Sequence, residues 1–188
     1  MSAPVTYRPG IFGHITSVDD LWDTIPWENR EGAPRYEAWM NDYCLPYTYG
    51  RGENARTYEA MSDWPMVADG VRGVLNSSFG LSFDCCFING YAHQRQHLGW
   101  HADDSPEMDH EHPIAVVSFG AEREIWFRKT SLIHVPGSIS GGIHQQLLGN
   151  GSLLLMHAGM QREWQHRIPK ADREVGKRVS LTFRRLVR

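Results

Sequence analysis

The chain has 188 residues, of which 41% are hydrophobic and 22% charged, and its formal net charge is −3. This size and composition predict one domain, residues 1–188, around one sizeable core. The slightly acidic balance excludes nucleic-acid binding through an overall positive field, and no apolar run approaches the roughly 18 residues of a membrane span. We expect no membrane partner and a monomeric protein.

The three cysteines are Cys44 and the adjacent pair Cys85 and Cys86. Their odd number and their spacing match neither a disulfide framework nor a metal-binding Cys-x-x-Cys pair. A reducing compartment follows, so we expect a cytoplasmic protein, or a nuclear one if the source is eukaryotic. The adjacent pair is expected in a core strand, with one side chain facing each way.

Two amphipathic helices are expected before residue 80. The first begins after Ser17, which can form a capping box with Asp20. The apolar face of this helix carries Val18, Leu21, Trp22 and Ile25. The second helix is expected to start near Pro65, with Asp63 as its cap. Its expected buried stripe consists of Val67, Val71, Val74 and Leu75.

Short apolar or alternating runs follow residue 81 and are separated by Gly, Pro and Asn. They predict strands over residues 82–89, 114–119, 124–127, 152–157 and 179–187, and the glycine-rich residues 137–151 predict a long loop or hairpin. Such spacing is typical of a sandwich or jelly roll rather than of βαβ units. The expected fold class is α+β with a mainly β core, in which an α-rich N-terminal part reaches to about residue 80.

The first candidate for chemistry is the tripeptide His101-Ala102-Asp103. Alternate residues of an extended chain point the same way, so the two side chains can occupy adjacent positions on one metal ion. The tripeptide alone is also typical of a surface histidine beside an acid. A further ligand is needed to favour a metal site.

His166 and the terminal strand supply further candidates. A His, an Asp and a distant His form the facial triad that binds Fe(II) and leaves coordination positions open. In the expected terminal strand, Val179, Leu181 and Phe183 face one way, and Arg178, Ser180, Thr182 and Arg184 face the other. Two guanidinium groups on one polar face predict an anionic partner such as the two carboxylates of 2-oxoglutarate. The alternative is an edge strand with a solvated basic face.

Local charge differs from the net charge, because residues 161–188 contain nine Lys or Arg against three Asp or Glu. A basic segment of this kind favours an anionic partner such as nucleic acid. A solvated strand end is the alternative interpretation.

Several motifs follow one another in a recognisable order. In chain order they are Asn89-Gly90-Tyr91, GWHADD (99–104), PIAVVSFGA (113–121), WFRK (126–129), WQHRIPK (164–170) and RVSLTFR (178–184). Further upstream stand Pro34-Arg35, Ala38-Trp39 and Leu45-Pro46-Tyr47-Thr48-Tyr49. From about residue 34 to the C-terminus, this series resembles the AlkB family of Fe(II)- and 2-oxoglutarate-dependent dioxygenases, which remove alkyl groups from nucleic-acid bases.

The resemblance implies a role for each matching residue. The implied iron ligands are His101, Asp103 and His166. The implied contacts to 2-oxoglutarate are Asn89, Tyr91, Arg178, Ser180 and Arg184, of which Arg184 also counts as catalytic. The implied contacts to the base are Tyr47, Tyr49 and Asp104. Ser180 stands where the family usually has Asn, and Ser105 stands where many relatives have Glu.

The resemblance also implies the fold and the reaction. A double-stranded β-helix over residues 81–188 would form the catalytic core, and residues 1–80 would form an extension with a nucleotide-recognition lid. With Fe(II), 2-oxoglutarate and O2, such a protein demethylates bases of the 1-methyladenine or 3-methylcytosine type in DNA, with RNA as a second candidate. Formaldehyde, succinate and CO2 would be released, and the base would be flipped out or single-stranded.

Other functions remain open at this level. A hydroxylase of the same architecture could act on a protein side chain or a small metabolite. A zinc hydrolase could use the same three ligands, but it would leave the paired arginines unexplained. A nucleic-acid-binding module with a structural metal is the non-enzymatic alternative.

Overall fold

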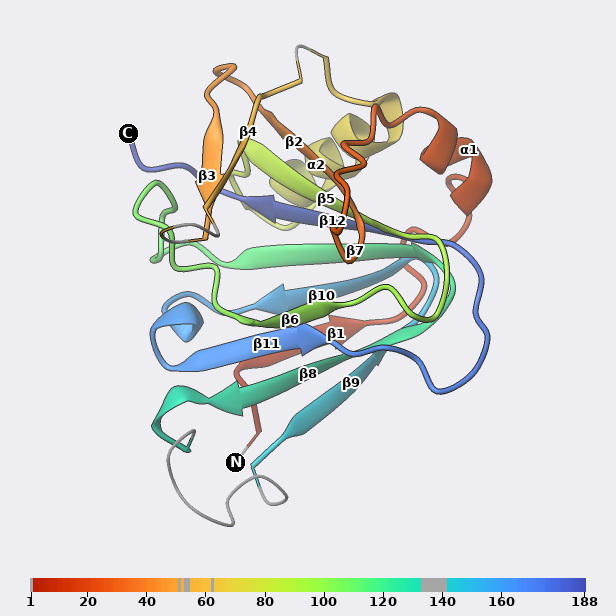
Figure 1. Ribbon diagram of the computed structural model, residues 1–188. Coiled ribbons are helices and arrows are strands. Elements are labelled where there is room, and N and C mark those ends of the chain that lie inside the picture. Colours follow the sequence, from red (N-terminus) through yellow and green to blue (C-terminus); the bar gives the residue numbers. More distant parts are fainter. Residues whose placement is uncertain (1, 51, 53–54, 62, 133–141) are drawn as a thin grey trace.

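A computed structural model describes residues 2–50, 52, 55–61, 63–132 and 142–188, and antiparallel sheets make up most of it (Figure 1). The largest sheet has six strands in the order β1-β10-β7-β12-β5-β2. Their bounds, in that order, are Val5–Arg8, Ser152–Met156, Ile114–Gly120, Arg178–Arg184, Cys85–Tyr91 and Tyr36–Asn41. β12 lies near the middle of this sheet, and its side chains are buried on both faces, against the helices on one side and toward the second sheet on the other.

A four-stranded sheet lies opposite the larger one in the order β6-β11-β8-β9 (Figure 1). The bounds of these strands are Leu98–His101, Trp164–Ile168, Arg123–Lys129 and His144–Leu148. A separate hairpin pairs β3 with β4, which span Tyr47–Tyr49 and Arg56–Tyr58. The two facing antiparallel sheets form the mainly β, jelly-roll core that the sequence predicts.

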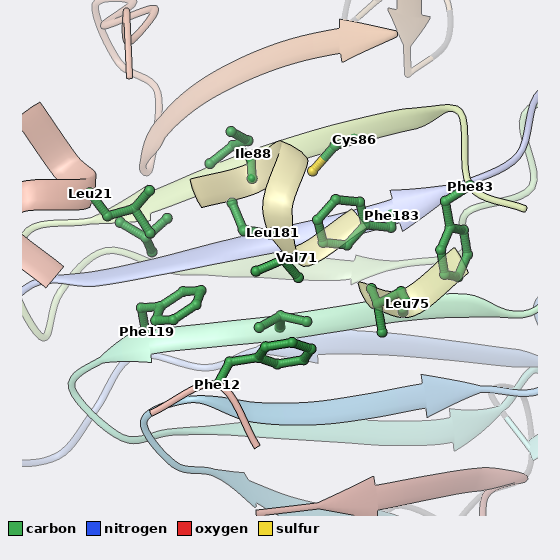
Figure 2. Close-up of a cluster of buried hydrophobic side chains, with 14 of the residues drawn as sticks. Phe12, Leu21, Val71, Leu75, Phe83, Cys86, Ile88, Phe119, Leu181 and Phe183 are labelled. Atoms are coloured by element: carbon green, nitrogen blue, oxygen red, sulfur yellow. The ribbon is translucent and has the colours of Figure 1, made fainter. Parts of the chain in front are cut away.

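Two helices, α1 (Val18–Asp23) and α2 (Met66–Ser78), pack on the outer face of the six-stranded sheet (Figure 1). Figure 2 shows the core between them, where Val71 and Leu75 of α2 meet Leu181 and Phe183 of β12. Short 3-10 turns cover Thr130–Leu132 and Met160–Arg162. Within these described ranges, no helix is long and apolar enough to cross a membrane.

A second core fills the space between the two sheets. Its members come from the inner faces of both sheets and include Val116, Leu154, Phe127, Trp164 and Ile168. A third cluster packs the β3–β4 hairpin against the six-stranded sheet through Trp39, Tyr47, Tyr58 and Phe87. The space beside these two clusters is where polar side chains gather.

The helix predictions are confirmed in outline and wrong in detail. Ser17 caps α1, and its side-chain oxygen accepts a hydrogen bond from the backbone N–H of Asp20 at 3.1 Å. The N-cap of α2 is Pro65, with no side-chain cap hydrogen bond, so the prediction of Asp63 as its cap is wrong. Val74 is 41% exposed and Ala68 is buried instead. The buried stripe centres on Ala68, Val71 and Leu75, and Val74 lies about a quarter turn away from it.

Residues before 80 contain both helices, as expected, but also four strands that were not predicted. β1 to β4 lie in this part of the chain, and β1 and β2 form the two edges of the six-stranded sheet. The segment predicted as a long loop or hairpin, residues 137–151, contains β9, an edge strand that pairs with β8. The sequence of β9, HQQLL, lacks a clean alternation of polar and apolar residues, so no strand was predicted there. Residues 133–141 lie outside the described part. The last predicted strand, 179–187, is Arg178–Arg184.

Candidate active site

Three predicted ligands meet between the two sheets. His101 ends β6, Asp103 follows two residues later, and His166 lies on β11 directly opposite His101 in the strand register. The Nε2 atoms of His101 and His166 lie 3.8 and 3.9 Å from the carboxylate oxygens of Asp103. One ligand atom from each residue lies within 4.8 Å of the others, so the three can hold one metal ion.

The chemistry of these donors fits a bound cation. The Nδ1 atom of His101 is 2.9 Å from the carbonyl oxygen of Gly99, so an Nδ1–H donates to that carbonyl and leaves Nε2 free as a ligand. Asp103 Oδ2 and His166 Nδ1 are buried without a hydrogen-bond partner among the described residues. Buried polar atoms are rarely left unpaired, so a cation beside Asp103 would satisfy a group that the protein alone does not.

Electrostatics keep the three residues in their ligand forms. Burial lowers the pKa of His166 to about 3 and also lowers the pKa of His101, so both imidazoles are neutral at physiological pH. Burial raises the pKa of the Asp103 carboxyl, but Arg184 and then the two histidines outweigh burial and bring this pKa below its usual value. Neutral imidazoles and a carboxylate are the protonation states that a divalent metal requires.

Arg184, at the end of β12, forms an ion pair with Asp103, the candidate carboxylate ligand of the metal. Its Nη2 atom lies 2.6 Å from Asp103 Oδ1, and both side chains are at most 7% exposed. Burial lowers the pKa of Arg184, but Asp103 more than compensates, so the guanidinium is firmly charged. The sequence placed Arg184 in the site but did not predict this ion pair.

Arg178, at the other end of β12, is surrounded differently. It is fully buried and donates from Nη2 to the hydroxyls of Ser118 and Ser180, at 3.0 and 3.3 Å. Its Nε and Nη1 atoms have no hydrogen-bond partner, and no carboxylate pairs with it among the described residues. Burial lowers its pKa to about 10, which leaves it charged. This buried cation fits an anionic ligand.

Tyr91 lies between Arg178 and a second buried arginine, Arg123. The Cζ atoms of the two arginines lie 5.2 and 5.4 Å from the Tyr91 ring centroid. Arg123 donates to the backbone carbonyls of Gln96 and Pro169, and its Nη1 atom has no partner in the described structure. Arg123 was not predicted from the sequence, because the alternation within β8 does not reveal that this residue contacts Tyr91 on a different strand.

A pocket contains the candidate metal ligands, and Arg178 and Arg123 are not among the residues that line it. Its walls combine all three candidate ligands with most of the predicted contacts, and the lining residues that matter here are Tyr47, Tyr49, Asn89, Tyr91, His101, Asp103, His166, Ser180 and Arg184. Asn89 Oδ1 accepts a hydrogen bond from Arg35 Nε at 2.6 Å, and Arg35 pairs with Glu37. Arg35 also lines the pocket. No contact in the site was predicted for Arg35 from the sequence.

The two tyrosines of β3 are placed differently. Tyr47 is 3% exposed, packs on Trp39 and shares a hydrogen bond with Ser105 through its hydroxyl at 2.9 Å. Tyr49 lies at the mouth of the pocket, edge-on to His101, with ring centroids 6.1 Å apart. Burial, followed by the charge of Asp103, raises the pKa of Tyr49 to about 12, so its hydroxyl stays protonated.

A shallow groove continues outward from this mouth. Tyr49, His101, Asp104, Ser105 and Gln165 are among the residues that line it. Asp104 therefore lies near the candidate ligands but outside the pocket itself. Among the residues that the structure describes, no second group of histidines and acids is arranged to hold a metal.

Two curated relatives resemble the chain in sequence. It is 32% identical over 176 residues to alpha-ketoglutarate-dependent dioxygenase alkB homolog 3 of Homo sapiens, covering 89% of this chain and 59% of the relative. It is 34% identical over 156 residues to DNA oxidative demethylase ALKBH2 of Bos taurus, covering 82% and 54%. The chain thus spans little more than half the length of these relatives.

The fold and the family are supported separately. The solved structure of OsALKBH1 superposes with a TM-score of 0.65 at 16% identity, covering 98% of this chain and 99% of the other, which is a likeness of fold. A family model described as "2OG-Fe(II) oxygenase superfamily" matches residues 23–184. The match extends over all described strands except β1 and includes all three candidate metal ligands, and the chain therefore belongs to the 2OG-Fe(II) oxygenase superfamily.

Proposed function

We propose that this protein is an Fe(II)- and 2-oxoglutarate-dependent dioxygenase that demethylates bases of the 1-methyladenine or 3-methylcytosine type in DNA, with RNA as a second candidate substrate. The observation that carries the proposal is the triad of His101, Asp103 and His166 together with Arg178, a buried cation without a carboxylate partner in the described structure. By strand alternation, Arg178 lies on the same face of β12 as Ser180 and Arg184, which line the pocket that contains the triad. The names of the relatives, which include a DNA oxidative demethylase, support the substrate class.

Each residue has a proposed task. His101, Asp103 and His166 hold Fe(II), and Arg184 orients Asp103 through their ion pair. Arg178 binds a carboxylate of 2-oxoglutarate, because a guanidinium pairs with a carboxylate through two charge-assisted hydrogen bonds. When bound, Fe(II) with 2-oxoglutarate and O2 supplies the oxidation that removes the methyl group as formaldehyde and yields succinate and CO2.

Three polar side chains complete the proposed cosubstrate site. Ser180 already accepts a hydrogen bond from Arg178, so it fixes the direction of the guanidinium. Tyr91 covers one side of Arg178 with its ring. Asn89 is held by Arg35, which orients the amide toward the pocket that both residues line. These contacts exclude water from the charged end of the ligand and thereby strengthen its electrostatic binding.

The base enters from the side of the β3–β4 hairpin. We propose residues 1–80 as the part that carries this recognition lid and residues 81–188 as the catalytic core. Tyr49 would stack on the base, Tyr47 would form the pocket wall behind it, and Asp104 would contact it in the outer groove. A base in a duplex cannot reach a buried site, so the target is flipped out or single-stranded.

The proposal includes the setting in which the protein acts. We infer a monomer in the cytoplasm, or in the nucleus of a eukaryotic cell, where thiols remain reduced. Cys85 and Cys86 are free and buried on opposite faces of β5, as the sequence predicts. Light scattering of the purified protein at several concentrations tests the monomer, and a mass twice that of the chain contradicts it.

A single experiment tests the activity. The protein, loaded anaerobically with Fe(II), is mixed with 2-oxoglutarate, O2 and single- or double-stranded oligonucleotides that each carry one modified base. Mass spectrometry should show loss of one methyl group from 1-methyladenine or 3-methylcytosine, with one succinate formed per repaired base. Succinate without any repaired base would favour a protein or metabolite substrate, and absence of succinate would favour a hydrolase or a binding module.

A further inference from the structure

The outer face of the four-stranded sheet carries two tryptophans and two arginines in alternation. Strand alternation explains their direction, because Ile125 and Phe127 of β8 are buried in the core and Trp126 and Arg128 therefore point outward. The register then places Arg167 of β11 opposite Trp126. With Trp100 of β6, these residues form a surface that we call the tryptophan–arginine face.

Contacts on this face hold the two guanidinium groups between indole rings. The Cζ atom of Arg167 lies 4.8 Å from the ring centroid of Trp100 and 4.3 Å from that of Trp126. The Cζ atom of Arg128 lies 4.3 Å from the Trp100 ring centroid. Cation–π contacts of this kind fix the positions of the arginines without neutralising their charge.

These two arginines differ in charge balance from four basic residues of the C-terminal segment. Arg162, Lys177, Arg185 and Arg188 of the basic C-terminal segment each pair with a carboxylate. Within the described residues, neither Arg128 nor Arg167 does so. Arg128 donates only to Gln165 Oε1, at 2.8 and 3.1 Å, and the buried Nε of Arg167 has no partner.

The acid on this face does not cancel the charge. Glu124 accepts a hydrogen bond from Trp126 Nε1 at 2.8 Å and forms no ion pair with either arginine. Burial, and then the nearby charge of Arg167, lowers the pKa of Arg128, so the two guanidinium groups repel each other. An anion bound between or beside them would relieve that repulsion.

Gln165 connects this face to the active site. Its side chain binds Arg128 and also lines the outer groove that contains Tyr49 and His101. On β6, Trp100 is the immediate neighbour of His101, and on β11 Arg167 is the immediate neighbour of His166. The same strands thus present ligands inward and the tryptophan–arginine face outward.

We propose that the tryptophan–arginine face binds the strand that flanks the target base, with Arg128 and Arg167 on phosphates and the indole rings against neighbouring bases. This inference rests on the proposed function, since it extends the path of the substrate from the pocket mouth over Gln165. A nucleic acid fits better than an acidic peptide because single strands combine regularly spaced phosphates with flat rings, the partners of paired guanidinium and indole groups.

The test is a binding measurement that does not depend on catalysis. Fluorescence anisotropy of an unmodified single-stranded oligonucleotide, titrated with the wild-type protein and with the Arg128→Gln, Arg167→Gln double variant, gives the dissociation constant at several salt concentrations. Loss of two phosphate contacts should reduce the slope of log K against log salt by about 1.4, which is roughly 25-fold weaker binding at about 0.1 M salt. The Arg128→Lys, Arg167→Lys variant should largely restore the slope because it keeps both charges.

A matched control removes two charges elsewhere. Arg8 lies on β1 against Phe79, and Arg162 pairs with Glu111, so the Arg8→Gln, Arg162→Gln variant should retain the wild-type slope. An unchanged slope in the Arg128, Arg167 variant overturns the proposal, as does an equal loss in the control. Competition by poly-glutamate as strong as that by an oligonucleotide of equal charge overturns it in favour of an acidic protein.

The outcomes separate this proposal from the proposed function. If the slope falls as expected but no alkylated base is turned over, the nucleic-acid surface stands and the demethylase assignment fails. If methyl groups are removed but the slope is unchanged in the variant, the demethylase stands and the surface fails. Melting temperatures of all variants show whether a loss of binding reflects unfolding instead, and a folded variant with normal binding counts against the surface.

Discussion

The two ends of β12 place the same side chain in opposite electrostatic situations. Arg184 and Arg178 lie six residues apart on one face of the strand, and both are at most 6% exposed. Arg184 is neutralised by Asp103, whereas Arg178 contacts neutral groups, namely the hydroxyls of Ser118 and Ser180 and the ring of Tyr91. One arginine therefore belongs to the internal structure of the metal site, and the other fits a charge that the ligand must bring.

Replacement of a triad residue should have the largest effect on activity, and its effect on stability should distinguish the two ends of β12. His101→Ala, His166→Ala and Asp103→Ala should each abolish succinate formation, because the remaining ligands cannot hold the metal. Asp103→Ala should also lower the free energy of unfolding by about 3–5 kcal/mol, since it leaves Arg184 buried without its partner. Chemical denaturation measures this loss.

A double variant provides the control for that loss. Adding Arg184→Met to Asp103→Ala removes the unpaired charge, so stability should recover while activity stays absent. Equal stability of the Asp103→Ala and His101→Ala variants would show that the Arg184 ion pair contributes little, and the contrast with Arg178 would lose its basis.

The next effect concerns the open end of the pocket. Tyr49→Ala should reduce the specificity constant for an alkylated oligonucleotide by about five- to 150-fold, since base–aromatic stacking contributes roughly 1–3 kcal/mol. Succinate formation without oligonucleotide should be retained, and both rates are measured by mass spectrometry. A loss of both activities together with a lowered melting temperature would assign Tyr49 to packing.

Tyr47→Phe is the matched variant for the neighbouring ring. It removes only the hydrogen bond to Ser105 and keeps the packing on Trp39, so we expect a change in oligonucleotide specificity of less than about fivefold, as loss of one neutral hydrogen bond of roughly 1 kcal/mol implies. A larger loss than in Tyr49→Ala would reverse the order of importance of the two tyrosines.

Arg178→Lys tests the proposed binding of 2-oxoglutarate at the other end of β12. We expect the 2-oxoglutarate concentration at half-maximal rate to rise by at least about tenfold, because a point charge replaces a planar fork and loses roughly 1.4 kcal/mol. Arg184→Lys should have the smaller effect on this concentration, since Arg184 acts through Asp103. Greater sensitivity at Arg184 would show that the division of roles along β12 is wrong.

The smallest expected signal is stabilisation by the ligand. With a redox-inactive divalent metal, 2-oxoglutarate at about 100 times its dissociation constant should stabilise the wild-type protein by about 2.7 kcal/mol. At the same concentration, tenfold weaker binding in Arg178→Lys should leave about 1.4 kcal/mol. Thermal denaturation measures the difference, and equal stabilisation of both proteins would separate Arg178 from cosubstrate binding.

Local regularities explain what the sequence could predict. The alternation of β12 correctly predicted that Val179, Leu181 and Phe183 lie on one face of the strand and the polar residues on the other. The three apolar residues enter the core beneath the helices, and the polar face is directed toward the pocket. A side-chain period of two is set by the backbone and needs no knowledge of the partner strand. Ser17 was likewise predictable, because a capping box is contained within four residues.

Long-range pairing explains what the sequence could not predict. The bonds of Arg184 to Asp103 and of Arg35 to Asn89 join residues that are far apart in the chain and that meet only through the sheet order. The strands β2 and β3 were missed because their sequences, YEAWMN and YTY, lack a clean alternation of apolar and polar residues. On β2, the polar side chains of Glu37 and Asn41 are buried rather than exposed.

The edge position of β6 has a consequence for communication across the sheet. Among the strands that the structure describes, β6 pairs with β11 alone, and the register between them shifts between His166 and Ile168. A strand held on one side by an interrupted ladder opens more easily than a central strand. Because His101 and Trp100 are adjacent on β6, a metal ion bound to His101 would restrict the motion of Trp100. Metal affinity and oligonucleotide affinity would then be thermodynamically coupled, each raising the other by the same factor.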